Sequence, residues 1–210
     1  MEKIIETIEE AQAIVDRNEK LIANILHDIK SPLFSIKIAL QNNLNNELNK
    51  DVFETTLFII RYIENFLTNY NFKKGKFENK KDKCDIAKII NQKIESYKYI
   101  FMDKGIVINL YCDNCDYSVN SIYIFLSSII GNIISNIAFH ATDKTEARIE
   151  LEKKKDYVLI DFKNQSQATM SDSSLGLDFC RNLANLCHAD FKLTKSKNSV
   201  NVILKVPNLN

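Results

Sequence analysis

One histidine in this chain lies among residues suited to phosphoryl chemistry. His27 directly precedes Asp28 in the segment Leu26-His27-Asp28-Ile29-Lys30-Ser31-Pro32-Leu33. A neutral imidazole is a good nucleophile at physiological pH, and a neighbouring carboxylate can hold the tautomer whose free nitrogen attacks phosphorus. His27 and Asp28 are therefore candidate catalytic residues, with an uninvolved surface histidine as the alternative.

The next helical turn adds further candidates. Lys30 and Ser31 lie where a phosphoryl group or an attacking water would need a cation or a hydroxyl, although Lys30 could equally be an ordinary solvated charge. Pro32 lacks an amide donor and predicts a kink one turn after the histidine.

Hydrophobic periodicity predicts a long amphipathic helix over residues 2–41. One heptad position holds Ile8, Val15, Ile22, Ile29 and Ile36, and a second holds Ile4, Ala11, Ile25 and Ala39. Leu26, Leu33 and Leu40 widen this stripe to the width that a helical bundle needs. His27 falls outside the stripe and is predicted to face solvent.

A second helix follows an asparagine-rich turn at 42–46. Its apolar residues recur at spacings of three and four: Phe53, Leu57, Ile60, Ile63, Leu67 and Tyr70. Such a hairpin leaves one apolar flank open. We therefore expect residues 1–72 to form a symmetric dimer, a four-helix bundle with one outward His27 per protomer.

A charged linker at 73–83 separates this hairpin from a second domain at 84–210. The pattern predicts helices over 85–102, 121–141 and 175–187, and strands over 106–111, 147–152, 157–163, 191–193 and 200–206. Helices and antiparallel strands segregate, so the predicted class is an α+β sandwich.

The segment from His27 to Leu33 resembles the phosphoacceptor box of sensor histidine kinases, and residues 84–207 are similar to their Bergerat-type ATP-binding domain. In that family a helix carries an Asn-x-x-x-Asn-x-x-Lys box, matched here by Asn132 and Asn136, but Phe139 replaces the lysine. The family's Asp-x-Gly-x-Gly box should fall at Asn164–Ala168, where its aspartate and both glycines are absent.

These departures affect nucleotide binding. Only Gly176 corresponds to the final glycine box, and the nucleotide lid is reduced to a few residues around Thr169–Asp172. Glycines let backbone amides approach phosphate closely. We therefore expect Asn132, Asn136 and Gly176 to be remnants of a degenerate site, with no ATP-driven autokinase activity, no cofactor and no metal in this chain.

The resemblance then implies an action on the aspartyl phosphate of a partner response regulator, whose receiver domain would hold Mg²⁺. Hydrolysis by a phosphatase is the preferred hypothesis, because Asp28 and Ser31 match the spacing of family members that orient water. The alternative is a phosphotransferase that relays the phosphoryl group through His27. An active sensor kinase and a non-catalytic module that binds the regulator are further alternatives.

Composition favours a cytoplasmic protein that binds neither nucleic acid nor membrane. The 210 residues carry a net charge of +1, without the basic face of nucleic-acid binders, and no secretory signal or uninterrupted apolar span is evident.

Five cysteines suit a reducing compartment. Cys112 and Cys115 have metal-ligand or redox spacing, but no second cysteine pair or histidine pair completes a zinc site, so we interpret the spacing as chance. Cys180 and Cys187 are predicted to be core residues.

Overall fold

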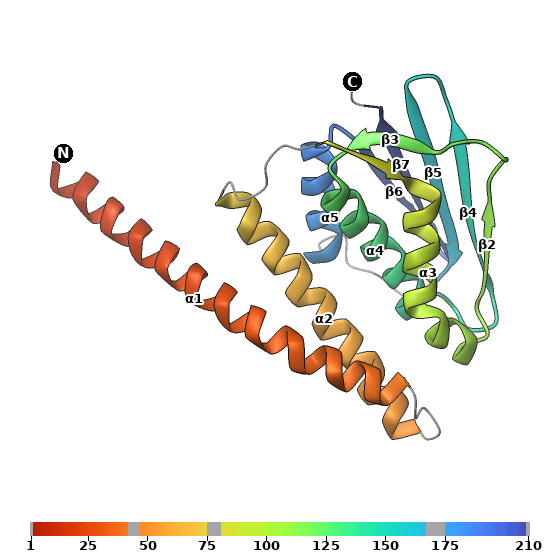
Figure 1. The fold of residues 1–210 in the computed structure, drawn as a ribbon, viewed down its shortest axis with the longest axis horizontal. Coiled ribbons are helices and arrows are strands. Elements are labelled where there is room, and N and C mark those ends of the chain that lie inside the picture. Colours follow the sequence, from red (N-terminus) through yellow and green to blue (C-terminus); the bar gives the residue numbers. More distant parts are fainter. Residues whose placement is uncertain (1, 42–46, 75–80, 167–174, 209–210) are drawn as a thin grey trace. The chain divides into compact units, whose positions relative to one another are not determined.

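The computed structural model describes residues 2–41, 47–74, 81–166 and 175–208 (Figure 1). The chain divides into two compact units, residues 1–78 and 79–210. Each unit has its own secondary structure and its own buried side chains.

The first unit is a helical hairpin of α1 (Glu2–Gln41) and α2 (Glu47–Lys73). α1 continues without interruption through Pro32. One stripe of α1 packs on α2, with Ala23 buried and Leu26, Leu33 and Leu40 half-buried. Of the α2 side chains that the spacing predicts, Leu67 is half-buried and the others are buried, namely Phe53, Leu57, Ile60, Ile63 and Tyr70.

The heptad residues of α1 lie on a different stripe. Val15, Ile22, Ile25, Ile29 and Ile36 are between 42% and 49% exposed, and on α2 Val52 and Ile59 are also exposed. Spacings of three, four and seven place the α1 residues on one face of that helix. The single wide stripe predicted from sequence is therefore two stripes, one buried within the hairpin and one without cover in the protomer.

The second unit is an α+β domain (Figure 1). Its strands are β1 (Asp82–Asp85), β2 (Val107–Tyr111), β3 (Ser118–Ser121), β4 (Glu146–Lys153), β5 (Tyr157–Gln165), β6 (Asp190–Lys195) and β7 (Ser199–Pro207). Its helices are α3 (Ile86–Asp103), α4 (Tyr123–His140) and α5 (Leu175–Leu186), and they cover one face of the larger sheet. That sheet has the strand order β2-β4-β5-β7-β6, and β1 pairs with β3 in a small separate sheet.

Three details differ from the sequence-based prediction. Strands β1 and β3 were not predicted, so Asp82 and Lys83 belong to a strand rather than to the linker, and Ser121 ends β3 instead of starting a helix. The sheet is also mixed, because β2 pairs parallel to β4 while the other pairs are antiparallel.

Asp85 caps α3 by accepting a hydrogen bond from the Lys88 amide at 3.0 Å.

The core of this unit lies between the helices and the inward face of the sheet. Alternate residues of β4, β5 and β7 are buried, including Ile149, Ile160, Phe162 and Leu204. Against them packs α4, whose Leu126, Ile129, Ile130 and Ile134 are all at 0% exposure. Contrary to the sequence-based expectation, α4 is long and apolar enough for a membrane span. Its burial explains that composition as that of a core helix.

Candidate functional site

The imidazole of His27 is strongly exposed on α1. Its side chain is 81% accessible, and its Nδ1 lies 3.7 Å from Oδ1 of Asp28, which is itself 86% accessible. That separation exceeds a hydrogen bond but lies within the range of an ion pair if the imidazole is protonated. With Nδ1 directed at the carboxylate, Nε2 is the nitrogen available to an incoming electrophile.

The other two residues predicted around His27 have different environments. Lys30 extends across the hairpin to α2, where its Nζ pairs with Oε1 of Glu64 at 3.0 Å, and it also lies over the ring of Phe34. Ser31 is exposed one turn after the histidine, and its carbonyl accepts a hydrogen bond from the Ser35 hydroxyl at 3.3 Å. The structure thus leaves His27, Asp28 and Ser31 on open surface and directs the Lys30 cation to α2.

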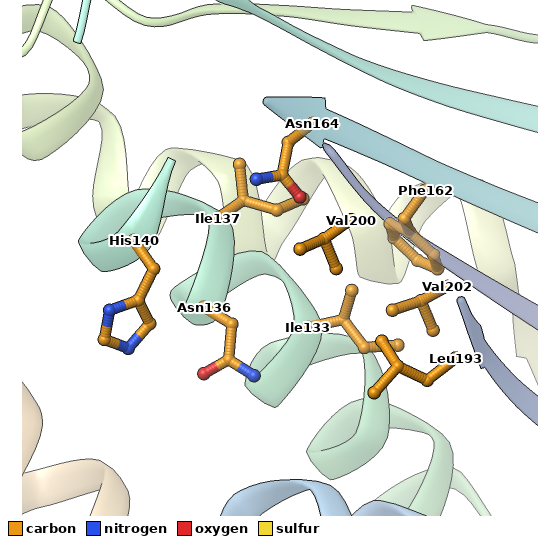
Figure 2. Close-up of a pocket in the computed structure, with 9 residues that line it drawn as sticks. All are labelled: Ile133, Asn136, Ile137, His140, Phe162, Asn164, Leu193, Val200 and Val202. Carbon is orange, nitrogen blue, oxygen red and sulfur yellow. The ribbon is translucent and has the colours of Figure 1, made fainter. Parts of the chain in front are cut away.

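A pocket lies in the second unit between α4 and the strands β5, β6 and β7 (Figure 2). Its walls are mostly apolar, and its polar lining consists of Asn136 and His140 from α4 and Asn164 from β5. The apolar lining residues are Ile133, Ile137, Phe162, Leu193, Val200 and Val202. None of the described lining residues is a lysine, arginine, aspartate or glutamate, so this part of the lining carries no fixed charge.

The asparagine box on α4 is only partly directed at this pocket. Asn136 lines the pocket, whereas Asn132 is buried and its amide donates to the carbonyl of Ser128 at 2.8 Å. Phe139, at the position of the family's lysine, packs edge-on against Tyr97 with ring centroids 6.1 Å apart. Phe139 is therefore a packing residue between α3 and α4.

Two hydrogen bonds connect the C-terminal end of β5 to the C-terminal end of α4. Ser166 is buried, and its hydroxyl donates to the carbonyl of His140 at 2.9 Å. The amide of Thr142 donates to the carbonyl of Gln165 at 2.9 Å. A hydroxyl side chain thus fills a position where the family has a glycine, and it joins two elements that border the pocket.

Two further predicted features lie at the limit of the described chain. Gly176 is in the first turn of α5. The segment predicted as a shortened lid, Thr169–Asp172, lies outside the described residues.

Sequence inspection missed two contributors to these sites. Glu64 was not recognised as the partner of Lys30, because the ion pair depends on the register between two helices. His140, which follows Phe139 on α4, was not recognised as a site residue, yet its side chain lines the pocket. Its spacing of four residues from Asn136 places both on one helical face, which is a signal that the sequence does contain.

Comparisons with known proteins agree with the fold. No family model matches the chain. Sensor protein KdpD of Clostridium acetobutylicum is 24% identical over 184 residues, covering 81% of this chain and 20% of that protein, so the chain spans about a fifth of the relative's length.

Several solved structures share the fold at low identity. Histidine kinase AdeS of Acinetobacter baumannii aligns with a TM-score of 0.63 at 12% identity, covering 88% of this chain and 98% of that one. The cytoplasmic segment of histidine kinase QseC gives 0.56 at 8% identity, covering 71% and 95% respectively. The catalytic domain of histidine kinase ThkA gives 0.55 at 15% identity, covering 61% and 97%.

Proposed function

Because this chain is a homologue of sensor histidine kinases in sequence and shares their fold, we propose that it is a two-component signalling protein that relays phosphoryl groups through His27 without making them from ATP. Its partners in this proposal are response regulators, and its place of action is the cytoplasm. The observation that carries the proposal is the exposed imidazole of His27 with Asp28 at its Nδ1.

The relay requires little beyond this arrangement. Nε2 of His27 attacks the phosphorus of the regulator's aspartyl phosphate in line, and the regulator's carboxylate leaves. Asp28 holds the proton on Nδ1 and stabilises the positive charge that develops on the ring. The regulator supplies the Mg²⁺ that neutralises its own acidic site. A second regulator's aspartate then takes the phosphoryl group by the reverse reaction.

Hydrolysis is the second candidate and rests on Ser31. A phosphatase orients water with a polar side chain one turn after the histidine, and Ser31 is exposed at that position. Its hydroxyl has the reach of a threonine hydroxyl but extends less far than the asparagine amide of other family phosphatases. Lys30 is held by Glu64, which weakens its role as an electrophilic partner for the reaction. These two features favour relay over hydrolysis.

The pocket supports the absence of autokinase activity. ATP carries several negative charges, and the described lining offers only uncharged amides and one imidazole. Phe139 packs on Tyr97 instead of presenting a cation, and Ser166 occupies a position of the family's glycines. We propose that this unit is kept for structure or for protein contacts.

We further propose that the hairpin dimerises. The surface of the hairpin carries a series of exposed apolar residues instead of single scattered ones. They are Val15, Ile22, Ile25, Ile29 and Ile36 on α1 and Val52 and Ile59 on α2. A second copy of the hairpin would cover this stripe about a twofold axis and complete a four-helix bundle.

The test follows phosphate from a phosphorylated receiver domain in the presence of Mg²⁺. Wild type should acquire acid-labile label on histidine, and His27→Ala should abolish labelling and transfer completely. Ser31→Ala should retain transfer within about twofold, since the serine is not the nucleophile. Asn24→Ala, an exposed change one turn before His27, is the matched control.

Rapid release of free phosphate without labelled protein, with activity retained by His27→Ala and lost in Ser31→Ala, would overturn the relay in favour of hydrolysis. Label appearing on His27 from ATP alone would overturn the absence of autokinase activity.

A further inference from the structure

The loop between β2 and β3 carries a cysteine pair that the proposed relay does not use. Cys112 and Cys115 are both exposed, separated by Asp113 and Asn114. The other three cysteines, Cys84, Cys180 and Cys187, are buried at 1% exposure or less. The chain therefore presents a close pair of accessible thiols alongside three protected ones.

The backbone of this loop folds back on itself around a tyrosine. The amide of Cys115 donates to the carbonyl of Asp113 at 2.8 Å, a bond between residues two apart that reverses the chain. Tyr117 is 3% exposed, and its hydroxyl accepts from the amide of Asp113 at 2.9 Å. The same hydroxyl donates to the carbonyl of Leu151 on β4 at 3.3 Å.

The surrounding charges hold the loop in place. Lys153 donates to the carbonyl of Asp116, and Lys83 pairs with the Asp116 carboxylate at 3.4 Å. Burial and the neighbouring Cys115 thiol raise the pKa of Tyr117 to about 12, which extends the pH range over which its hydroxyl can donate to Leu151. The two cysteines thus flank a turn that is anchored on the strand beside it.

We propose that Cys112 and Cys115 form a reversible dithiol site that exchanges with small disulfides of the oxidised-glutathione type. One thiolate attacks a sulfur of the small disulfide and displaces one reduced thiol, which leaves a mixed disulfide on the protein. The second thiolate then attacks that sulfur, closes the Cys112–Cys115 bond and releases the second reduced thiol. The two electrons of the dithiol reduce the small disulfide, and the two thiol protons end on the released thiols.

A metal site is the weaker alternative for this pair. Among the described residues, no group of three or more histidine, cysteine, aspartate or glutamate side chains is arranged to hold a metal ion. Two thiolates alone leave a structural zinc site incomplete. A disulfide needs only two sulfurs, and Cys112 and Cys115 are three positions apart on a loop that turns between Asp113 and Cys115.

The experiment treats the whole native protein with oxidised glutathione and analyses it by intact mass and peptide mapping. Wild type should lose two hydrogens and carry a Cys112–Cys115 linkage, which dithiothreitol reverses. Cys112→Ser and Cys115→Ser should each stop at a single glutathione adduct. Cys180→Ser, a change in a buried thiol, should behave as wild type.

Hydrogen exchange supplies an independent readout, because ring closure around Asp113 and Asn114 should slow exchange of the Asp113 amide at least threefold. Stable adducts on both cysteines of wild type, disulfide-linked dimers, or a linkage to a buried cysteine would each overturn the proposal.

Discussion

Two isoleucines of the hairpin should respond differently to substitution, although the sequence places both in one bundle core. Ile22 is 45% exposed, whereas Ile60 is 5% exposed. At 45% exposure, the Ile22 side chain has roughly 80 Å² of accessible apolar surface. Covering that area in a dimer would contribute about 2 kcal/mol. Each protomer of a twofold dimer contributes one Ile22 to the interface. Ile22→Asp should therefore reduce the free energy of dimerisation by about 4 kcal/mol or more and raise the dissociation constant at least about 1,000-fold. Ile60→Ala should instead destabilise each protomer by about 3 kcal/mol through a cavity between α1 and α2.

Sedimentation across a protein dilution series, with circular dichroism at each concentration, separates these effects. Ile22→Asp should be a helical monomer at concentrations where wild type is dimeric, and Ile60→Ala should lower the unfolding midpoint. Asn24→Asp adds the same charge at an exposed polar position of α1 and should stay dimeric. A wild-type monomer at micromolar concentration, or an Ile22→Asp dimer of unchanged affinity, would refute the assignment of the exposed stripe to a self-interface.

Three further outcomes follow from the second unit. Because the pKa of Tyr117 is raised to about 12, the unfolded chain releases this proton first, so stability should fall as pH rises from about 10 to about 12. In urea titrations, Tyr117→Phe should lose less free energy of unfolding than wild type between these pH values. An equal loss in the variant and wild type would contradict the attribution of this loss to Tyr117. His188 has a φ of 55°, so His188→Gly should raise the free energy of unfolding by about 1 kcal/mol, whereas His188→Ala should not. Calorimetry with Mg²⁺-ATP should give no saturable binding below about 1 mM, and a micromolar dissociation constant would contradict the uncharged pocket.

The elements that could be predicted from sequence are those defined by local spacing. The limits of α1 match the predicted range, and five of the six apolar residues that recur at three and four in α2 are buried, with Leu67 half-buried. The alternating β4 and β5 pair antiparallel as predicted, over residues 147–153 and 158–164. Each of these signals is contained in one continuous segment, so no knowledge of the tertiary fold is required.

The features that escaped prediction depend on contacts between distant segments. β1 and β3 have four residues each, too few for a reliable alternation, and they become strands because they pair with each other. β2 was predicted as a strand, but its parallel pairing with β4 follows from the path of the intervening chain. The separation of Ile22 from Leu26 onto two stripes likewise depends on how closely α2 approaches one side of α1.

The same distinction explains why the two candidate sites differ in how far sequence can define them. An exposed nucleophile such as His27 depends on one helix, its neighbour Asp28 and access to solvent. A nucleotide pocket depends on side chains that converge from α4, β5, β6 and β7, so one change alters what its neighbours can bind. Phe139 illustrates this, because the residue at the lysine position adds to the packing of α3 on α4 through Tyr97. The proposed relay uses this independence, because it needs the exposed histidine on the hairpin and no nucleotide chemistry from the companion domain.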